Sequence, residues 1–184
     1  MKKVFALILA LILLASLCAC KKGGPEKSFD KEGYKQLIED CIKLIESYDE
    51  ETARKVICPG MLDYYIKSNE EQGRDFLALL QKQFEENQAK YAQVYGNDWK
   101  LTYTIESADE KDAEGIQKYK EFDSFYFDNY SVNTDNIQAV TFVKVNIHIE
   151  GENGSNDKTK TVQCFCVDNE WYSFYAVMLG LNLV

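Results

Sequence analysis

Three strand-like runs near the end of the chain constrain its fold more than any other feature. They span Gln138–Glu150, Lys158–Val167 and Trp171–Val177, and they are joined by the polar loop Gly151–Asp157 and by an Asp-Asn-Glu turn. In the first run Val143, Val145, Ile147 and Ile149 alternate with polar residues. This two-residue period indicates a strand with one buried and one solvated face. We therefore expect a β-meander whose apolar face is covered by the rest of the chain.

Amphipathic helices are expected before the meander. In residues 29–48 apolar side chains recur at helical spacing, and charged residues fill the other side. The apolar face consists of Tyr34, Leu37, Ile38, Cys41, Ile42, Ile45 and Tyr48. Asp49 can cap a second helix over Glu50–Ile57, and Cys58-Pro59-Gly60 is expected to interrupt the chain before Met61–Lys67 resumes helical character.

A long helix, a strand and a further helix should follow. Ser68–Glu71 has the form of a capping box, which predicts a helix from there to about Tyr95, where Gly96-Asn97 stops it. Trp99–Ser107 alternates apolar and polar residues and is predicted to be a half-buried strand. A second capping box, Ser107–Glu110, predicts a helix whose buried face contains Ile116, Tyr119, Phe122 and Tyr126.

The N-terminus has the pattern of an export signal. Lys2 and Lys3 precede an apolar run, Val4–Ala19, that is too short for a membrane-spanning helix. The run ends in Leu17-Cys18-Ala19-Cys20, which resembles the lipobox of bacterial lipoproteins. The alternatives are an ordinary secretory peptide or a cut before Cys18, which the bulky Leu17 disfavours.

The lipobox resemblance implies a lipid anchor. Residues 1–19 would be removed as a lipoprotein signal peptide, and Cys20 would become the acylated N-terminus. Residues 20–28 would form a tether, with Gly23-Gly24-Pro25 in its centre, and residues 29–184 a single domain. The resemblance thus places the protein at the cell membrane, anchored by lipid on its extracytoplasmic face.

The charge of the chain argues against nucleic acid as a partner. The formal net charge of the 184 residues is −9, and the leader contains two lysines and no acidic residue, so its removal makes the protein more acidic. Phosphate binding needs clustered Lys and Arg, which this chain lacks. The expected partners are the membrane, through the anchor, and an envelope protein, a cell-wall component or a small ligand.

Four cysteines remain if Cys18 leaves with the leader and Cys20 is acylated. They are Cys41, Cys58, Cys164 and Cys166. Export permits disulfides, but Cys164 and Cys166 lie two apart in a predicted strand, where both side chains share a face and cannot easily bond to each other. We favour buried thiols that pack as small apolar groups, and we expect no metal and no cofactor.

The order of the predicted elements defines an α+β protein in which N-terminal helices pack on a mostly antiparallel four-stranded sheet. With the acidic turn Tyr48–Glu51 and the hairpin Val167–Trp171, this order resembles the nuclear-transport-factor-2-like, or cystatin-like, superfamily. The resemblance implies a curved, mostly antiparallel sheet that wraps around helices to form a cone. Members of this superfamily include enzymes, ligand carriers and assembly modules, so it does not define an activity.

Motifs for catalysis are absent from the sequence. The chain has no Gly-x-Ser-x-Gly and no phosphate-binding glycine loop, and its one histidine, His148, is predicted on the solvated face of a strand. Gly151–Asp157 lacks the ligand register of a calcium loop and is expected to be a plain hairpin loop. We predict no catalytic residue.

Aromatic residues are the remaining candidates for a site. Many pack in the core, but a few rings are in excess of what one buried face needs. We predict that Tyr126, Tyr130, Trp171 and Tyr175 contribute to a ligand or partner surface. The resulting hypothesis is a membrane-anchored, non-catalytic binding module of the cell envelope. The alternative is a small hydrolase or isomerase that uses an Asp or a Tyr in the cone cavity.

Overall fold

The computed structural model describes residues 29–175 and residue 183. Its elements, in chain order, are α2 (Tyr34–Glu46), α3 (Glu50–Val56), α4 (Pro59–Glu70), α5 (Phe76–Tyr95), β1 (Lys100–Glu110), α6 (Ala113–Phe122), α7 (Ser124–Asn129), the 3-10 helix η1 (Thr134–Asn136), β2 (Ile137–Gly151), β3 (Gly154–Val167) and β4 (Glu170–Tyr172). The predicted leader, Cys20 and the predicted tether lie outside the described residues.

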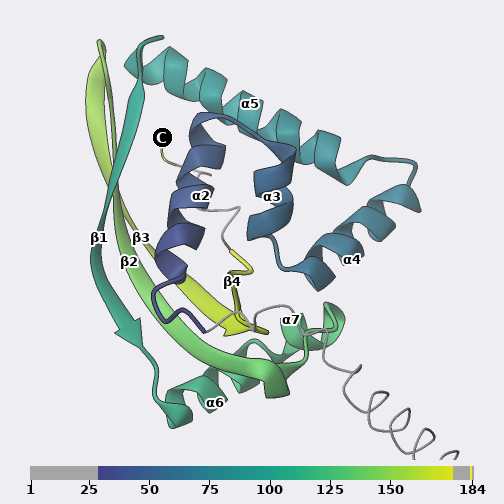
Figure 1. The fold of residues 1–184 in the computed structure, drawn as a ribbon. Coiled ribbons are helices and arrows are strands. Elements are labelled where there is room, and N and C mark those ends of the chain that lie inside the picture. The colour runs from purple at the N-terminus through teal and green to yellow at the C-terminus, as the bar shows by residue number, and fades with distance from the viewer. Residues whose placement is uncertain (1–28, 176–182, 184) are drawn as a thin grey trace, which may run out of the picture.

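The four strands form one open antiparallel sheet in the order β1-β2-β3-β4, which confirms the predicted α+β class. Strands β2 and β3 are long and curve together around helix α2 (Figure 1). The register shifts between Ile105 and Ser107 in β1 and between Ile137 and Ala139 in β2. Irregularities of this kind bend a strand and increase its twist, and so contribute to the curvature.

The concave face of the sheet holds the larger hydrophobic core. The predicted apolar face of α2 and the alternating residues of β2 belong to one cluster, in which Ile38, Val143 and Val145 are fully buried. Burying an aliphatic side chain of this size contributes about 1.5–3 kcal/mol relative to leaving it in water. The predicted packing of helix against strand is therefore confirmed.

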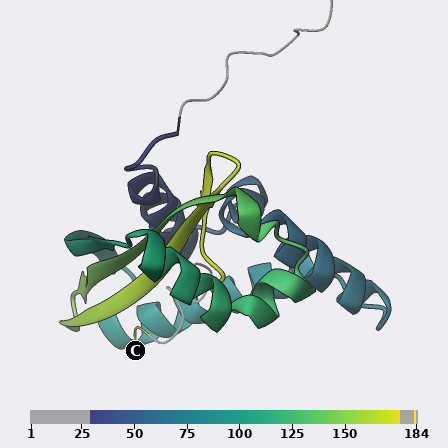
Figure 2. The same cartoon turned by 90° about the horizontal axis from the view of Figure 1, so that it is seen from below.

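A second, largely aromatic core lies on the opposite face of the sheet. Here Tyr119 of α6 and Phe127 of α7 pack on Phe165 of β3, and Phe174 lies against the same ring. Figure 2 shows α6 and α7 crossing in front of the sheet when the molecule is seen from below. The face of β2 that was predicted to be solvated is therefore covered near the start of the strand. It reaches solvent only farther along β2, where His148 lies.

Two predicted helix starts are wrong. Helix α4 continues through Ser68 to Glu70, and the long helix α5 starts later, where the Asp75 carboxylate accepts hydrogen bonds from Leu77 N and Ala78 N. Ser107–Glu110 remains in β1, where it pairs with β2, and Asp112 caps α6 instead. A capping-box pattern cannot be told from an ordinary helical or strand segment until the pairing partners are known.

The structure also differs from the predictions at the end of α6 and in the meander. Phe122 is 79% exposed because α6 ends there and the chain restarts as α7. The predicted loop Gly151–Asp157 is largely strand, since β2 and β3 pair up to Gly151 and Gly154. Strand β4 is short, and residues 176–177 of the predicted third run lie outside the described residues.

The four cysteines of the domain are free, buried thiols, as favoured from the sequence. Cys41 and Cys164 belong to the core on the concave face, and Cys58 to the core on the opposite face. Burial raises the pKa of Cys164 to about 12, so this thiol is neutral at physiological pH. These side chains act in packing.

Candidate functional site

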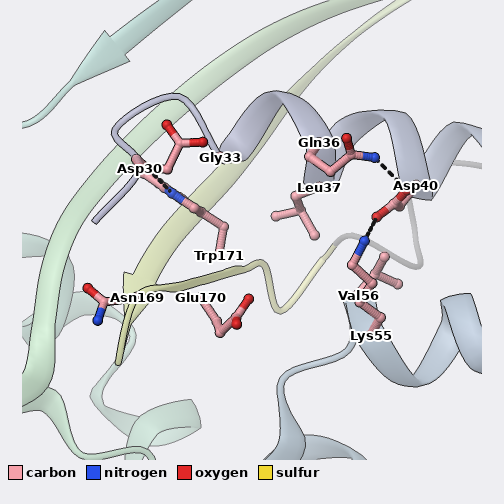
Figure 3. Close-up of a pocket in the computed structure, with 10 residues that line it drawn as sticks. All are labelled: Asp30, Gly33, Gln36, Leu37, Asp40, Lys55, Val56, Asn169, Glu170 and Trp171. Atoms are coloured by element: carbon pink, nitrogen blue, oxygen red, sulfur yellow. Dashed lines mark hydrogen bonds and ion pairs between the residues drawn. The ribbon is translucent and has the colours of Figure 1, made fainter. Parts of the chain in front are cut away.

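A pocket of about 330 Å³ opens between the start of α2, helix α3 and the turn that joins β3 to β4 (Figure 3). It is lined by Asp30, Gly33, Gln36, Leu37, Asp40, Lys55, Val56, Asn169, Glu170 and Trp171. Small-molecule sites in proteins commonly measure roughly 300–1,000 Å³. The pocket can therefore hold a ligand of a few heavy atoms, and three separate segments of the chain build it.

Trp171 forms a fixed wall of this pocket. Its indole Nε1 donates a hydrogen bond of 2.7 Å to the carbonyl oxygen of Asp30, and its rings pack against Phe29 and Tyr34. Gly33 permits this contact, because a Cβ there would lie 2.4 Å from Cδ1 of Trp171. The segment before α2 is thereby held against β4.

Asp40 and Lys55 place an ion pair in the pocket and connect α2 to α3. Asp40 is 6% exposed, and its Oδ2 lies 2.5 Å from Nζ of Lys55. Its Oδ1 accepts a hydrogen bond of 2.8 Å from Gln36 Nε2. The side chain of Lys55 is 61% exposed, so its ammonium group, which has three donors, can still reach a ligand.

The pocket presents both signs of charge beside an apolar wall. Glu170, from β4, and Asp40 supply carboxylates, whereas Lys55 supplies the ammonium. Leu37 and Val56 complete the apolar side with Trp171 (Figure 3). This arrangement suits a small ligand that carries both a cationic and an anionic group. In the described part of the chain, no group of three or more His, Cys, Asp or Glu is placed to hold a metal ion.

A larger concavity, of about 750 Å³, lies between α3, α4 and the start of α5. Three of its charged groups, those of Glu50, Arg54 and Asp75, are already engaged within the structure. Arg54 pairs with Glu50 at 2.9 Å, and the carboxylate of Asp75 caps α5. We regard the pocket beside Trp171 as the better candidate, because three separate segments of the chain build it and the hydrogen-bonded indole of Trp171 gives it a fixed aromatic wall.

The structure separates the four aromatic residues predicted to bind. Tyr126, Tyr130 and Tyr175 lie together, with ring centroids of Tyr126 5.9 Å from each of the other two, while Trp171 is part of the core on the other face of the sheet. We call the group of Tyr126, Phe127, Tyr130, Phe174 and Tyr175 the α7 aromatic cluster.

The members of this cluster differ in exposure. Tyr130 is buried, and its hydroxyl donates to that of Tyr65 at 3.2 Å, so it has a packing role. Tyr126 is partly buried and Tyr175 is exposed, as is the neighbouring Phe125. Of the three cluster residues that were predicted to bind, Tyr126 and Tyr175 have rings that a partner can reach, and Tyr130 does not.

The sequence analysis missed Asp40, Lys55 and Glu170. A signal for Asp40 was present, because it lies three residues after Leu37, where the helical spacing calls for an apolar side chain. A carboxylate at such a position needs a partner. The partner, Lys55, lies on a different helix and could not be assigned from spacing.

Comparison of the chain with models of protein families, with curated proteins and with solved structures found no match. Within residues 29–175 and residue 183, no helix has the length and apolar character needed to cross a membrane. A function for this protein therefore has to be argued from its own residues.

Proposed function

We propose that this protein is a lipoprotein of the cell envelope, anchored by Cys20 on the extracytoplasmic face of the membrane, and that its domain is a non-catalytic binding module. Its ligand site is the pocket beside Trp171. We further assign the domain to the nuclear-transport-factor-2-like, or cystatin-like, superfamily, because a long curved hairpin wraps around one helix as that architecture requires.

The observation that carries this proposal is the pocket itself. The space between the sheet and α2, where an enzyme of this architecture would have its cavity, is filled by buried apolar residues such as Ile38 and Ile147. The pocket beside Trp171, in contrast, combines a fixed aromatic wall with accessible charges. Pockets with an apolar wall and a few placed polar groups are typical of small-ligand sites.

The ligand class follows from the charges. The Lys55 ammonium can bind a carboxylate of the ligand, and the carboxylate of Glu170 can bind an ammonium group. Amino acids and short peptides carry this pair of groups. They are also chemically compatible with the proposed cell-wall and envelope partners.

Binding can be tested with the full-length protein in detergent, titrated calorimetrically with a panel of amino acids and dipeptides. We expect saturable binding, and Glu170→Gln should weaken it by roughly 10- to 150-fold, since a hydrogen bond to a charged group contributes about 1.5–3 kcal/mol. Glu39→Gln is the matched control, because Glu39 is on α2 but does not line the pocket.

Two results would contradict this assignment. If no member of the panel binds, the ligand class is wrong. If a ligand binds equally well to Glu170→Gln but poorly to Tyr175→Ala, the binding surface is the α7 aromatic cluster rather than the pocket.

One observation favours the hydrolase or isomerase alternative. Asp123 and Tyr119 are buried side by side, and an acid next to a phenol can serve in proton transfer. The pair lies on the α6–α7 side of the sheet, shut off from solvent, and not in the space around α2. Turnover of a small substrate that is abolished by Asp123→Asn, without loss of the fold, would support the enzyme.

A further inference from the structure

Asp123 joins helix α6 to helix α7 and is almost completely buried. Its backbone carbonyl accepts hydrogen bonds from Tyr126 N at 2.9 Å and Phe127 N at 3.1 Å, which start α7. Only 1% of the residue is exposed, and within the described part of the chain neither carboxylate oxygen has a hydrogen-bond partner. A short helix therefore begins on a residue whose own side chain is unsatisfied.

The surroundings of this carboxylate are aromatic and offer no positive charge. Tyr119, one turn earlier on α6, is close enough to influence Asp123, but its hydroxyl makes no hydrogen bond of good geometry. Asp123 also acts electrostatically on Tyr175. Among the described residues, no Lys, Arg or His contributes to the pKa of Asp123.

The described residues that pack around Tyr119 supply no compensating group either. The ring of Tyr119 packs on Phe127, Phe142 and Phe165. Lys111 lies over the ring of Phe142, 4.3 Å from its centroid, and pairs with Asp109. An ionised carboxylate in such a place is unfavourable, because desolvation is not offset by a partner.

Burial raises the pKa of the Asp123 carboxyl above its ordinary value, and the Tyr119 hydroxyl lowers it by less. The folded chain therefore holds a proton that the unfolded chain has already lost. Between pH 3.8 and the raised pKa, the stability of the folded state falls as the pH rises. Above the raised pKa the folded state bears the full free-energy cost of a buried, ionised carboxylate. This pH dependence of stability is opposite in sign to that of an aspartate in a salt bridge, which stabilises the fold more as the pH rises.

We propose that Asp123 is a proton-binding site of the α6–α7 joint, and that loss of its proton loosens the joint and exposes the α7 aromatic cluster. When protonated, the carboxyl is neutral and can stay buried beside Tyr119 without an uncompensated charge. When ionised, the carboxylate gains hydration only if α7 moves away from the sheet. Because α7 starts on the same residue, its helix and the rings of Tyr126 and Tyr130 respond together. This device is independent of the ligand pocket.

The test measures hydrogen-exchange protection factors in the full-length protein between pH 3 and pH 8. The amides of Tyr126, Phe127 and Tyr130 report on α7 through their hydrogen bonds. Their protection should fall about tenfold for each pH unit between 3.8 and the raised pKa of Asp123. Amides in β2 should keep their protection.

Three variants make the test specific. Asp123→Asn should abolish the pH dependence, and Tyr119→Phe should extend it to higher pH because the hydroxyl that lowers the pKa is gone. Asp128→Asn, an exposed aspartate on α7, should behave as wild type. An Asp123→Asn variant with the wild-type pH profile would overturn the proposal.

A direct titration decides the matter if Asp123→Asn does not fold. The side-chain carboxyl carbon of Asp123, followed by NMR in the wild-type protein, should titrate above 3.8. A carboxyl that titrates at or below that value would overturn the proposal, as would a raised titration without any change in the protection of α7.

Discussion

Gly60 shows how a single residue can be fixed by a contact between distant parts of the chain. It is in the first turn of α4, and a Cβ at this position would lie 1.7 Å from the carbonyl oxygen of Tyr130. Tyr130 follows α7, so the backbone of one helix rests directly on the end of another. The break predicted at Cys58-Pro59-Gly60 is confirmed, since α3 ends at Val56 and α4 starts at Pro59, two residues before the predicted Met61. Gly60 permits the contact with Tyr130.

We expect Gly60→Ala to lower the free energy of unfolding by about 2–3 kcal/mol, because a clash with backbone cannot be relieved by turning a side chain. Chemical denaturation measures the change. Gly115→Ala is the control: its Cβ would approach Cβ of Lys111 at 3.0 Å, a far milder contact than the 1.7 Å at Gly60, and alanine favours the helix. Equal stability of the two variants would show that the Gly60 contact is not formed.

At the scale of elements, α2 is the helix on which both the larger core and the pocket depend. One side of it packs in the sheet, where Ile38 and Cys41 are buried, and another side supplies Gln36 and Asp40 to the pocket. A displacement of α2 would therefore change the stability of the domain and the geometry of the site together.

Ile38→Asp tests this placement of α2. It puts an unpaired charge into the larger core and should cost several kcal/mol, comparable to the whole stability of a domain of this size. Far-ultraviolet circular dichroism with thermal melting should show an unfolded or strongly destabilised chain. His148→Ala, on the solvated face of β2, should melt close to wild type, and a normally folded Ile38→Asp variant would refute the packing.

At the scale of the whole molecule, the proposed anchor determines where the pocket and the α6–α7 joint can act. The structure describes the chain from Phe29, and the proposed tether of residues 20–28 connects that point to the lipid. A tether of this length allows the domain to lie close to the membrane surface while its acidic charge keeps it off anionic lipid.

Replacing Cys20 by serine tests the anchor. The variant should not be acylated, and it should accumulate as uncleaved precursor or be released after another cut, since acylation needs the thiol. Membrane fractionation with mass spectrometry of the N-terminal peptide distinguishes these outcomes. Cys18→Ser, which leaves the proposed acceptor intact, should still be acylated, and an unmodified Cys20 in membrane-bound wild type would disprove the anchor.

The sequence by itself determined the class of fold and most of its elements. Periodicity is a local property, so the apolar face of α2, the alternation in β2 and the cap of Asp49 on α3 could be predicted from neighbouring residues. Helix starts were less certain, because Ser68–Glu71 and Ser107–Glu110 satisfy a capping pattern while tertiary pairing continues the preceding element.

Only the tertiary structure decided the site. The pocket joins Asp40 to Lys55 and places Trp171 beside Gly33, and these contacts depend on how α2, α3 and β4 pack. Likewise, the sequence alone predicts that Asp123 is an ordinary surface residue. It is buried because α6 and α7 pack on the sheet. Contacts between distant segments determine which side chains are buried and which partners they have. These contacts leave no periodic pattern in the sequence from which they could be predicted.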